Sequence, residues 1–311
     1  MPIRRINIIG MGALGLLFGR PIMENLGGGQ PCYVMDAARK ARHEKETYTL
    51  NGEKLAPHIV TPEEAEKADL VLVGVKYPGL SDALDVMASS VGEDTIIISL
   101  MNGVDSEEIL AERFGRDKVL YSVSQEMDAQ RYGSELVYTK AGRLYIGVPN
   151  SFEPELRAVL SEKLDRVCAF FDEVGFPYKR EEDILYRQWS KFMLNCGCNQ
   201  ICMVYDCGYG RAMERGGEEF AMMTGAMREV CAIAQAMGIS VGEPEVRQYL
   251  NILRTLDPEA PPSMGQDRRQ KKRSEVDMFA GTVIRYGEKL GIETPVNDFM
   301  LRRVREIEAA Y

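Results

Sequence analysis

One lysine and two asparagines in the second half of the chain are spaced to share one face of a helix. Lys191, Asn195 and Asn199 stand four residues apart in a segment that predicts a helix over residues 184–205. At about 100° per residue, the three side chains fall within about 80° of one another around the helix axis. The segment is otherwise rather apolar, so these polar groups need partners. A small polar ligand could be that partner, and ordinary hydrogen bonds that bridge two domains are the other explanation.

A lysine in such a place could act as an acid in catalysis. Partial loss of water around an ammonium lowers its pKa toward a range in which it can donate a proton to a developing alkoxide. Histidine is the more common donor, but the chain has only two. His43 follows an expected strand and His58 lies in a polar connecting stretch. We therefore expect both histidines at the surface, away from an active site.

A glycine-rich turn near the N-terminus has the context of a dinucleotide-binding motif. It follows a β-branched run at residues 6–9 and opens a helical pattern that continues to Leu26, before Gly27, Gly28 and Gly29. In that motif the three glycines permit a tight turn, close approach of backbone N–H groups to a pyrophosphate, and helix–strand packing. The helix N-terminus also favours negative charge. A turn without a ligand is the alternative. The turn consists of Gly10, Met11, Gly12, Ala13, Leu14 and Gly15.

The residues after the second expected strand, at 32–35, give conflicting indications about the cofactor. Asp36 ends this strand, and an acid at that place commonly binds the adenosine ribose hydroxyls and favours NAD. Arg39, Lys40 and Arg42 follow directly and could instead hold the 2′-phosphate of NADP. They could equally form a solvated helix start, so NAD and NADP both stay open.

The apolar pattern predicts an α/β domain in the first part of the chain. Strands and helices alternate, and continuous apolar runs at 70–75 and 95–99 are typical of strands in a parallel sheet covered on both faces. Later strands are expected at 119–124, 136–139 and 144–148, with a hairpin turn at 141–143. We therefore predict a Rossmann-type, dinucleotide-binding domain over residues 1–182.

Beyond residue 182 nearly every segment has helical spacing. We predict an all-α domain over residues 183–311 that serves substrate binding and dimerisation. The expected helices in and before this domain lie at 154–174, 184–205, 218–237, 243–256, 268–290 and 297–310.

The composition limits the classes of partner. The 311 residues are 45% hydrophobic and 27% charged, which is ordinary for a folded protein of about two domains. A net charge of −9 disfavours a nucleic-acid partner, which needs a concentrated basic face. No apolar stretch approaches the ~20 residues of a membrane span, and the N-terminus does not resemble a signal peptide. The seven cysteines are an odd number, and we expect reduced thiols in a cytoplasmic protein.

Two further clusters could suggest other chemistry. Cys196, Cys198, Cys202 and Cys207 would, on one helix, divide between opposite faces and could not converge on a tetrahedral ion, so no metal site is expected. The basic run at 268–273 is expected to be a solvated helix face. A role in binding the cofactor phosphate or in steering the substrate is its alternative.

Several motifs together resemble the ketopantoate reductase family. The glycine turn, Lys76 after the third buried strand, and the Met101-Asn102-Gly103-Val104 turn after the next are similar to its N-terminal motifs. The spacing of Lys191, Asn195 and Asn199 is similar to its catalytic helix. Its late signatures are similar to Ser263-Met264-x-Gln266-Asp267, Ser274-Glu275-x-Asp277 and Gly291-Ile292-x-Thr294-Pro295-x-Asn297. The motifs occur in the family's order from residue 10 to residue 297.

The resemblance implies an activity and a role for each matching residue. The enzyme would reduce 2-dehydropantoate to pantoate, in pantothenate and CoA biosynthesis, with NADP(H). Lys191 would be the general acid, and Glu275 would bind the substrate and orient Lys191. Asn195 and Asn199 would hold the substrate's polar groups, and Ser263 its carboxylate. Asn102 would lie beside the nicotinamide and the substrate, and Lys76 near the adenosine end. The family also suggests a homodimer formed through the helical domain.

The chain departs from the family pattern at two places. The family more often has an arginine near the end of its second strand, where this chain has Asp36, so NAD(H) stays possible. The cysteine-rich segment from Cys196 to Cys202 replaces the family's usual small apolar residues, so another small 2-keto acid is an alternative substrate. A dinucleotide-binding sensor without turnover is the alternative of another class. The complete set of polar site residues argues against it, because a sensor needs no proton donor.

Overall fold

The computed structural model describes residues 2–27 and 29–311, so Gly28 of the expected glycine stop lies outside the described residues. The chain divides into two compact units. The first, here called the sheet unit, spans Met1–Asn102 and Ser106–Ile184, and the second, the helical unit, spans Gly103–Asp105 and Leu185–Tyr311. The main division lies between Ile184 and Leu185, and the short segment at 103–105 groups with the helical unit.

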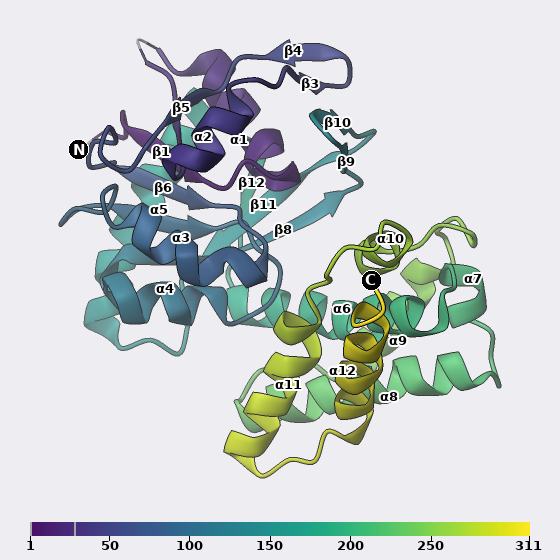
Figure 1. The fold of residues 1–311 in the computed structure, drawn as a ribbon. Helices are drawn as coiled ribbons and strands as arrows, with labels where there is room; N and C mark the ends of the chain where they lie inside the picture. Colours follow the sequence, from purple (N-terminus) through teal and green to yellow (C-terminus); the bar gives the residue numbers. More distant parts are fainter. Residues whose placement is uncertain (1, 28) are drawn as a thin grey trace. The chain divides into compact units, whose positions relative to one another are not determined.

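The sheet unit is built on an eight-stranded sheet with the order β12-β11-β8-β7-β6-β1-β2-β5 (Figure 1). The strands from β5 to β8 run parallel, β11 is antiparallel to β8, and β12 is parallel to β11. Taken in chain order, the six parallel strands follow the order 3-2-1-4-5-6 of dinucleotide-binding sheets, which confirms the predicted Rossmann-type fold. The strands are β1 (Ile6–Ile9), β2 (Cys32–Val34), β5 (His58–Val60), β6 (Leu70–Val73), β7 (Ile96–Ser99), β8 (Val119–Met127), β11 (Ala141–Gly147) and β12 (Tyr178–Arg180).

Helices cover both faces of this sheet. Neighbouring side chains of a strand point to opposite faces, so Ile8 and Leu72 enter one core while Ile9 and Val73 enter the other. The first core also contains residues of α1 (Ala13–Asn25) and α5 (Pro154–Glu173), and the second contains residues of α3 (Leu80–Met87) and α4 (Ser106–Phe114). The shorter helices of this unit are α2 (Ala37–His43), η1 (Tyr77–Gly79) and η2 (Arg116–Lys118).

A second, four-stranded sheet with the order β4-β3-β10-β9 belongs to the same unit. The expected hairpin turn at 141–143 is wrong: β11 already begins at Ala141 and pairs with β8, whereas β10 pairs with β9 and β3. Gly142 has a φ of +66° beside Gln125 of β8, so this glycine lies within a paired strand and forms no hairpin turn. The strands of the second sheet are β3 (Tyr48–Leu50), β4 (Glu53–Leu55), β9 (Gln130–Tyr132) and β10 (Glu135–Val137).

The helical unit contains α-helices only, apart from its connecting segments. In the described part of the chain, no helix is both long and apolar enough to span a membrane. The helices are α6 (Ile184–Tyr205), whose first residue still belongs to the sheet unit, α7 (Tyr209–Ala212), α8 (Glu218–Ala236), α9 (Glu243–Leu253), α10 (Ser263–Arg269), α11 (Val276–Leu290) and α12 (Pro295–Glu308).

The single helix expected at 268–290 is wrong, because the chain forms two helices there. Lys271 adopts a left-handed φ of +50°, its N–H donates to the carbonyl of Arg268, and the N–H of Lys272 donates to the carbonyl of Asp267. This pair of hydrogen bonds is a Schellman motif, which ends a helix and usually has glycine at the left-handed position. The basic run therefore does not form one solvated helix face.

A buried polar network ties four helices of this unit together. Asn297 of α12 donates to Glu229 of α8 at 2.7 Å and accepts from Gln200 of α6 at 3.0 Å. Gln200 in turn accepts from the N–H of Ala280 on α11 at 3.1 Å. Glu229 also accepts from the N–H groups of Val296 and Asn297, so its negative charge caps the N-terminus of α12.

Candidate active site

The glycine turn joins β1 to α1 with very little space between backbone segments. Gly10 has a φ of +102°, and a Cβ atom there would lie 2.7 Å from the carbonyl group of Gly74, just after β6. A Cβ atom on Gly15 would lie 2.0 Å from the carbonyl oxygen of Gly10. At Gly12, by contrast, the nearest atom would be 3.6 Å away. The first and third glycines therefore permit the close packing, whereas a Cβ atom at the second would meet only an ordinary van der Waals contact.

The start of α1 suits a pyrophosphate. Gly12 is the N-cap residue and supplies no side-chain acceptor to the N–H groups of the first turn, which includes Ala13 and Leu14. That turn also has no acidic residue. The N–H groups and the helix dipole therefore favour an anion, so these residues fit the phosphates of a dinucleotide.

Arg131 contacts this turn and was missed by the sequence analysis. One Nη1–H of Arg131 donates to the carbonyl oxygen of Met11, and Nε–H donates to Gly133 at 2.7 Å. The guanidinium lies 5.6 Å from the centre of the Tyr48 ring. Arg131 lies on β9, far along the chain from the turn, and no local pattern marks it. Only the pairing of β9 into the second sheet brings its positive charge to the glycine turn.

Asp36 serves first as a helix cap. Its Oδ1 accepts from the N–H of Arg39 at 2.8 Å, and its Oδ2 lies 3.3 Å from the guanidinium of the same arginine. Lys40 forms an ion pair with Glu64 at 2.6 Å, and Arg42 is exposed. Lys76 is also exposed and caps the short helix η1. Asp36 and Arg39 thus lie at the start of α2 and Lys40 and Arg42 in its last turn, an arrangement that is compatible with either dinucleotide.

Lys191 lies on α6 and interacts electrostatically with Glu275. The residue as a whole is half-buried, and the loss of hydration around its ammonium lowers the pKa of Lys191 to about 8, although the carboxylate of Glu275 acts to raise it. Glu275 immediately precedes α11, and its carbonyl accepts from the N–H groups of Met278 and Phe279. The fold of the helical unit therefore brings together an acid and a base that are far apart in the sequence.

The two asparagines continue along α6 from Lys191. Asn195 is half-buried, and Asn199 is 7% exposed. The C-terminal end of α6 packs against α10, because Arg268 donates to the carbonyls of Met203 and Val204. Arg268 thus supplies hydrogen-bond donors to carbonyls at the end of α6 and does not face only solvent. Ser263, the first residue of α10, is exposed.

The predicted site residues divide between the two units. The glycine turn, Asp36, Lys76 and the half-buried Asn102 belong to the sheet unit. The helical unit contains the other predicted site residues, which are Lys191, Asn195, Asn199, Ser263 and Glu275.

The expectation that Cys207 shares one helix with the other three cysteines of this segment is wrong, because α6 ends at Tyr205. Asp206 has a φ of +50°, and the N–H of Cys207 then donates to the carbonyl of Cys202. Hydrogen bonding with Cys198 raises the pKa of the Cys202 thiol, and hydrogen bonding with Cys202 raises that of Cys207. These three thiols therefore lie together. Within residues 2–27 and 29–311, no group of three or more His, Cys, Asp or Glu side chains could hold a metal ion.

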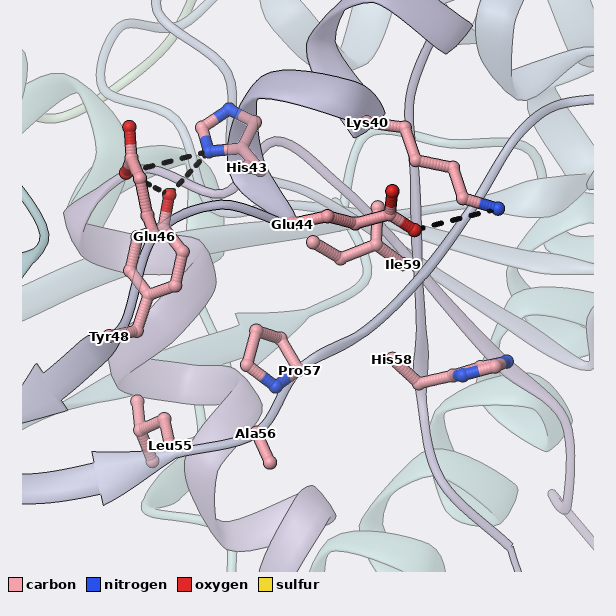
Figure 2. A pocket seen from close by; sticks show the side chains of 10 residues that line it. All are labelled: Lys40, His43, Glu44, Glu46, Tyr48, Leu55, Ala56, Pro57, His58 and Ile59. Carbon is pink, nitrogen blue, oxygen red and sulfur yellow. Dashed lines mark hydrogen bonds and ion pairs between the residues drawn. The ribbon is translucent and has the colours of Figure 1, made fainter.

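A polar pocket of about 480 Å³ in the sheet unit contains both histidines (Figure 2). His58 is exposed as expected, but the His43 side chain is only 15% exposed, and burial lowers the pKa of its ring. Nδ1 of His43 contacts the hydroxyl of Tyr48, which donates to Glu46. Of the residues singled out for the cofactor, Lys40 lines this pocket, and none of those predicted for catalysis or substrate binding does. It is lined by Lys40, His43, Glu44, Glu46, Tyr48, Leu55, Ala56, Pro57, His58 and Ile59.

The strand order, the glycine turn and the partly desolvated lysine are together typical of oxidoreductases that use a nicotinamide dinucleotide. Two family models match the chain: Ketopantoate reductase PanE/ApbA over residues 6–151, and Ketopantoate reductase PanE/ApbA C terminal over residues 183–308. The chain belongs to the ketopantoate reductase PanE/ApbA family and is an NAD(P)-dependent oxidoreductase. The resemblance found in the sequence motifs is thereby confirmed.

Relatives match over nearly the whole chain. A 2-dehydropantoate 2-reductase of Vibrio cholerae is 25% identical and covers 98% of this chain and 98% of its own. One of Archaeoglobus fulgidus is 28% identical and covers 99% of each. The crystal structure of a PanE/ApbA family ketopantoate reductase from Ralstonia eutropha JMP134 has a TM-score of 0.80 at 26% identity, covering 98% of this chain and 99% of that one. A complex of D-mandelate dehydrogenase with NADH and anilino(oxo)acetate has a TM-score of 0.81 at 23% identity and covers 98% of each chain, which shows a shared fold.

Proposed function

We propose that this protein reduces 2-dehydropantoate to pantoate, a step of pantothenate and CoA biosynthesis. The observation that carries the proposal is the state of Lys191. Its pKa is lowered to about 8 by loss of hydration, and it shares a helix face with Asn195 and Asn199. A proton donor of this strength suits the reduction of a ketone, because the developing alkoxide must receive a proton.

Different residues of the proposed site bind the substrate and transfer the proton. When bound, the reduced nicotinamide supplies the hydride that adds to the keto carbon. Lys191 gives its proton to the ketone oxygen as the carbonyl electron pair becomes an alkoxide. Glu275 favours the protonated form of Lys191 and orients it. The substrate is held by the amides of Asn102, Asn195 and Asn199 and by the Ser263 hydroxyl, which binds its carboxylate.

The cofactor is held by the sheet unit. The glycine turn and the first turn of α1 bind the pyrophosphate, and Lys76 lies near the adenosine end. The family membership supports NADP(H). The charge of Asp36 at the start of α2 supports NAD(H), since a carboxylate repels a 2′-phosphate and accepts hydrogen bonds from ribose hydroxyls.

Replacement of Lys191 tests the proposed mechanism. We expect Lys191→Ala to lower kcat on 2-dehydropantoate by roughly 10²–10⁴-fold, the usual contribution of a positioned acid, with little change in the Kd of the dinucleotide. Lys289→Ala removes an exposed lysine of the same unit and serves as the control. Steady-state kinetics and a fluorescence titration of the bound dinucleotide measure the two quantities. A kcat within tenfold of the wild-type value would count against Lys191 as the acid.

Reduction of another small 2-keto acid is the second candidate. The observation that favours it is the buried Cys196 and Cys198 on α6, at the level of Asn195 and Asn199, where the family usually has small apolar residues. A panel of 2-keto acids assayed with NADH and NADPH decides between the two, and a higher kcat/KM on another acid would displace 2-dehydropantoate. Binding of a dinucleotide without turnover on any acid would instead favour a sensor.

The location and the assembly of the protein also follow as proposals. All seven cysteines are free, which suits a reducing compartment such as the cytoplasm. The resemblance to the family favours a homodimer formed through the helical unit. Analytical ultracentrifugation tests the dimer, and a sedimentation mass near that of one 34.9 kDa chain would reject it.

A further inference from the structure

The glycine turn is contacted by a side chain that comes from the second, four-stranded sheet. Arg131 of β9 donates through Nη1 to the carbonyl oxygen of Met11, although the two residues are 120 positions apart in the chain. Met11 is buried and Arg131 is half-buried. Both residues belong to the sheet unit, so this contact lies within a single compact part of the molecule.

The guanidinium of Arg131 is held at more than one point. Its Nε–H donates to the carbonyl of Gly133 at 2.7 Å, and the group lies 5.6 Å from the centre of the Tyr48 ring. Tyr48 is only 1% exposed, and its own hydroxyl contacts Nδ1 of His43 and donates to Glu46. A planar guanidinium with two hydrogen bonds in different directions and an aromatic ring beside it keeps one orientation.

The strand that carries Arg131 is anchored in the core beneath the glycine turn. Arg131 pairs with Leu136 of β10, and Leu136 pairs with Leu50 of β3. Leu136 and Leu50 are fully buried, and they belong to the same core cluster as Leu16 and Leu17 of α1. The second sheet and the helix that follows the turn are therefore packed together, which gives Arg131 a fixed base.

The carbonyl that Arg131 binds belongs to the same peptide group as the N–H of Gly12. This group is planar and trans, so the carbonyl and the N–H point to opposite sides. Gly12 is the N-cap residue of α1, and its N–H is one of those without an acceptor in the helix. A bond that fixes the carbonyl of Met11 therefore also fixes the direction of an N–H group that can bind an anion.

The helix does not fix this peptide group by itself. The carbonyl of Gly12 accepts from the N–H of Leu16 at 3.1 Å, so the peptide after Gly12 already belongs to α1. The peptide before Gly12 lies outside the helix, between Gly10 and Gly12, and glycine restricts the backbone less than any other residue. The hydrogen bond from Arg131 therefore acts where the local backbone preference is weakest.

We propose that Arg131 is a positioning residue for dinucleotide binding, which fixes the peptide between Met11 and Gly12 so that the Gly12 N–H is oriented for the pyrophosphate. Arg131 acts through this peptide and not by contact with the dinucleotide. The inference rests on the proposed function, because it is there that the glycine turn binds the pyrophosphate. It adds to that function a residue outside the glycine-rich motif, on which the affinity for the cofactor depends.

Replacement of Arg131 should weaken dinucleotide binding without slowing the chemical step. We expect Arg131→Ala to raise the Kd of both NADH and NADPH by about tenfold, which corresponds to one hydrogen bond to a charged group. The kcat at saturating dinucleotide should stay within about twofold of the wild-type value, because the proposed proton donor is unchanged. A fluorescence titration and steady-state kinetics measure the two quantities. A Kd within about twofold of the wild-type value would overturn the inference.

Glu53→Ala is the matched control. Glu53 of β4 forms an ion pair with Arg20 of α1, so it also links the second sheet to this helix, but it does not contact the glycine turn. We expect its Kd for both dinucleotides to stay within about twofold of the wild-type value. A loss as large as that of Arg131→Ala would show a general effect of the second sheet on α1 and would overturn the inference.

The salt dependence separates positioning from simple attraction of the phosphates by a positive charge. Between about 0.05 M and about 0.5 M salt, the ratio of the Kd of Arg131→Ala to that of the wild type should stay constant, because an oriented peptide is not screened. A ratio that falls toward one at high salt would overturn the positioning role. Arg131→Met keeps an apolar chain beside Tyr48 without a donor, and the same results are expected of it if the alanine variant does not fold.

Hydrogen exchange shows whether a failure lies in this inference or in the proposed function. Bound NADH or NADPH should slow the exchange of the amides of residues 12–14 in the wild-type protein. Protection of these amides together with an unchanged Kd in the Arg131 variants would overturn the role of Arg131 alone. Absence of dinucleotide binding, or binding without this protection, would overturn the proposed cofactor site and the inference with it.

Discussion

Lys191 shows how burial and charge together set the strength of an acid. Loss of hydration favours the neutral amine and lowers its pKa to about 8, whereas the carboxylate of Glu275 favours the ammonium. A fully hydrated lysine would be too weak an acid to protonate an alkoxide efficiently near neutral pH, and a fully buried one without a carboxylate would be deprotonated. The balance leaves Lys191 mostly protonated at pH 7 but close to releasing its proton.

This balance predicts the pH dependence of the reaction. Because the ammonium is the reactive form, kcat on the keto acid should fall as the pH rises through about 8, and the fall should approach tenfold per unit above it. In Glu275→Gln the carboxylate that raises the pKa is lost, so the alkaline limb should move to lower pH. A pH–rate profile of both proteins measures the two limbs. A profile that is flat from pH 7 to pH 10 would exclude Lys191 as the acid.

Among single residues, Lys191, Glu275 and Gly10 stand in motifs that the sequence shows by itself, but Arg131 does not. Gly10 is marked by its place between a strand and a helix, and Lys191 by its spacing from two amides. Arg131 reaches Met11 only because β9 joins a sheet with β10, β3 and β4. A contact over such a separation depends on strand pairing, which leaves no local pattern around Arg131.

At the level of elements, helix ends were harder to predict than helix faces. The helix predicted from residue 184 to about residue 205 is observed over Ile184–Tyr205. The end of α10 was missed, since its Schellman motif places Lys271 rather than a glycine in the left-handed conformation. The strand β11 begins three residues before its predicted start at 144, because Gly142 lies within the strand and forms no turn. For Gly142 the pairing of β11 with β8 decided the conformation, whereas Lys271 is held by the local hydrogen bonds of its own helix end.

The N-terminus of α2 carries Asp36, whose charge we expect to influence which dinucleotide the protein uses. Asp36→Asn should keep the cap on this helix, because asparagine is as good an N-cap as aspartate, and it should remove the charge that opposes a 2′-phosphate. We therefore expect the ratio of kcat/KM for NADPH to that for NADH to rise by about tenfold, with little change in Tm. Steady-state assays with both dinucleotides measure the ratio.

Asp36→Ala is the control for this substitution. It removes the charge and the cap together, so it should raise the same ratio while destabilising the protein by about 0.5–2 kcal/mol. If the ratio stays constant in both variants, Asp36 does not take part in the choice of dinucleotide.

For the whole molecule, the closing motif of the sequence has a structural role in the helical unit. Asn297, at the end of that motif, is fully buried and joins α12 to α6 and α8 through Gln200 and Glu229. Removal of one partner from such a network leaves buried polar groups unsatisfied. The motif thus contributes to the packing of the unit that carries Lys191 and Glu275.

Asn297→Ala should lower the free energy of unfolding of the helical unit by about 1–3 kcal/mol. Trp189 is the only tryptophan of the chain and lies buried on α6, so its fluorescence during denaturant unfolding reports on this unit. Asp298→Ala, which breaks an exposed pair with Arg302, is the neighbouring control and should change the free energy by less than about 0.5 kcal/mol. Equal values for the two variants would contradict the assigned role of Asn297.

The sequence by itself determined the order of elements, the parallel α/β sheet, the glycine turn and the helix face of Lys191. Each of these is predicted by local sequence patterns, and the periods of about 2 and 3.6 residues in those patterns follow from backbone geometry. Only the tertiary structure decided that Arg131 reaches Met11 and that residues 103–105 pack on α11. These contacts join segments far apart in the chain, and they form only when strands pair and helices pack, which no local pattern specifies.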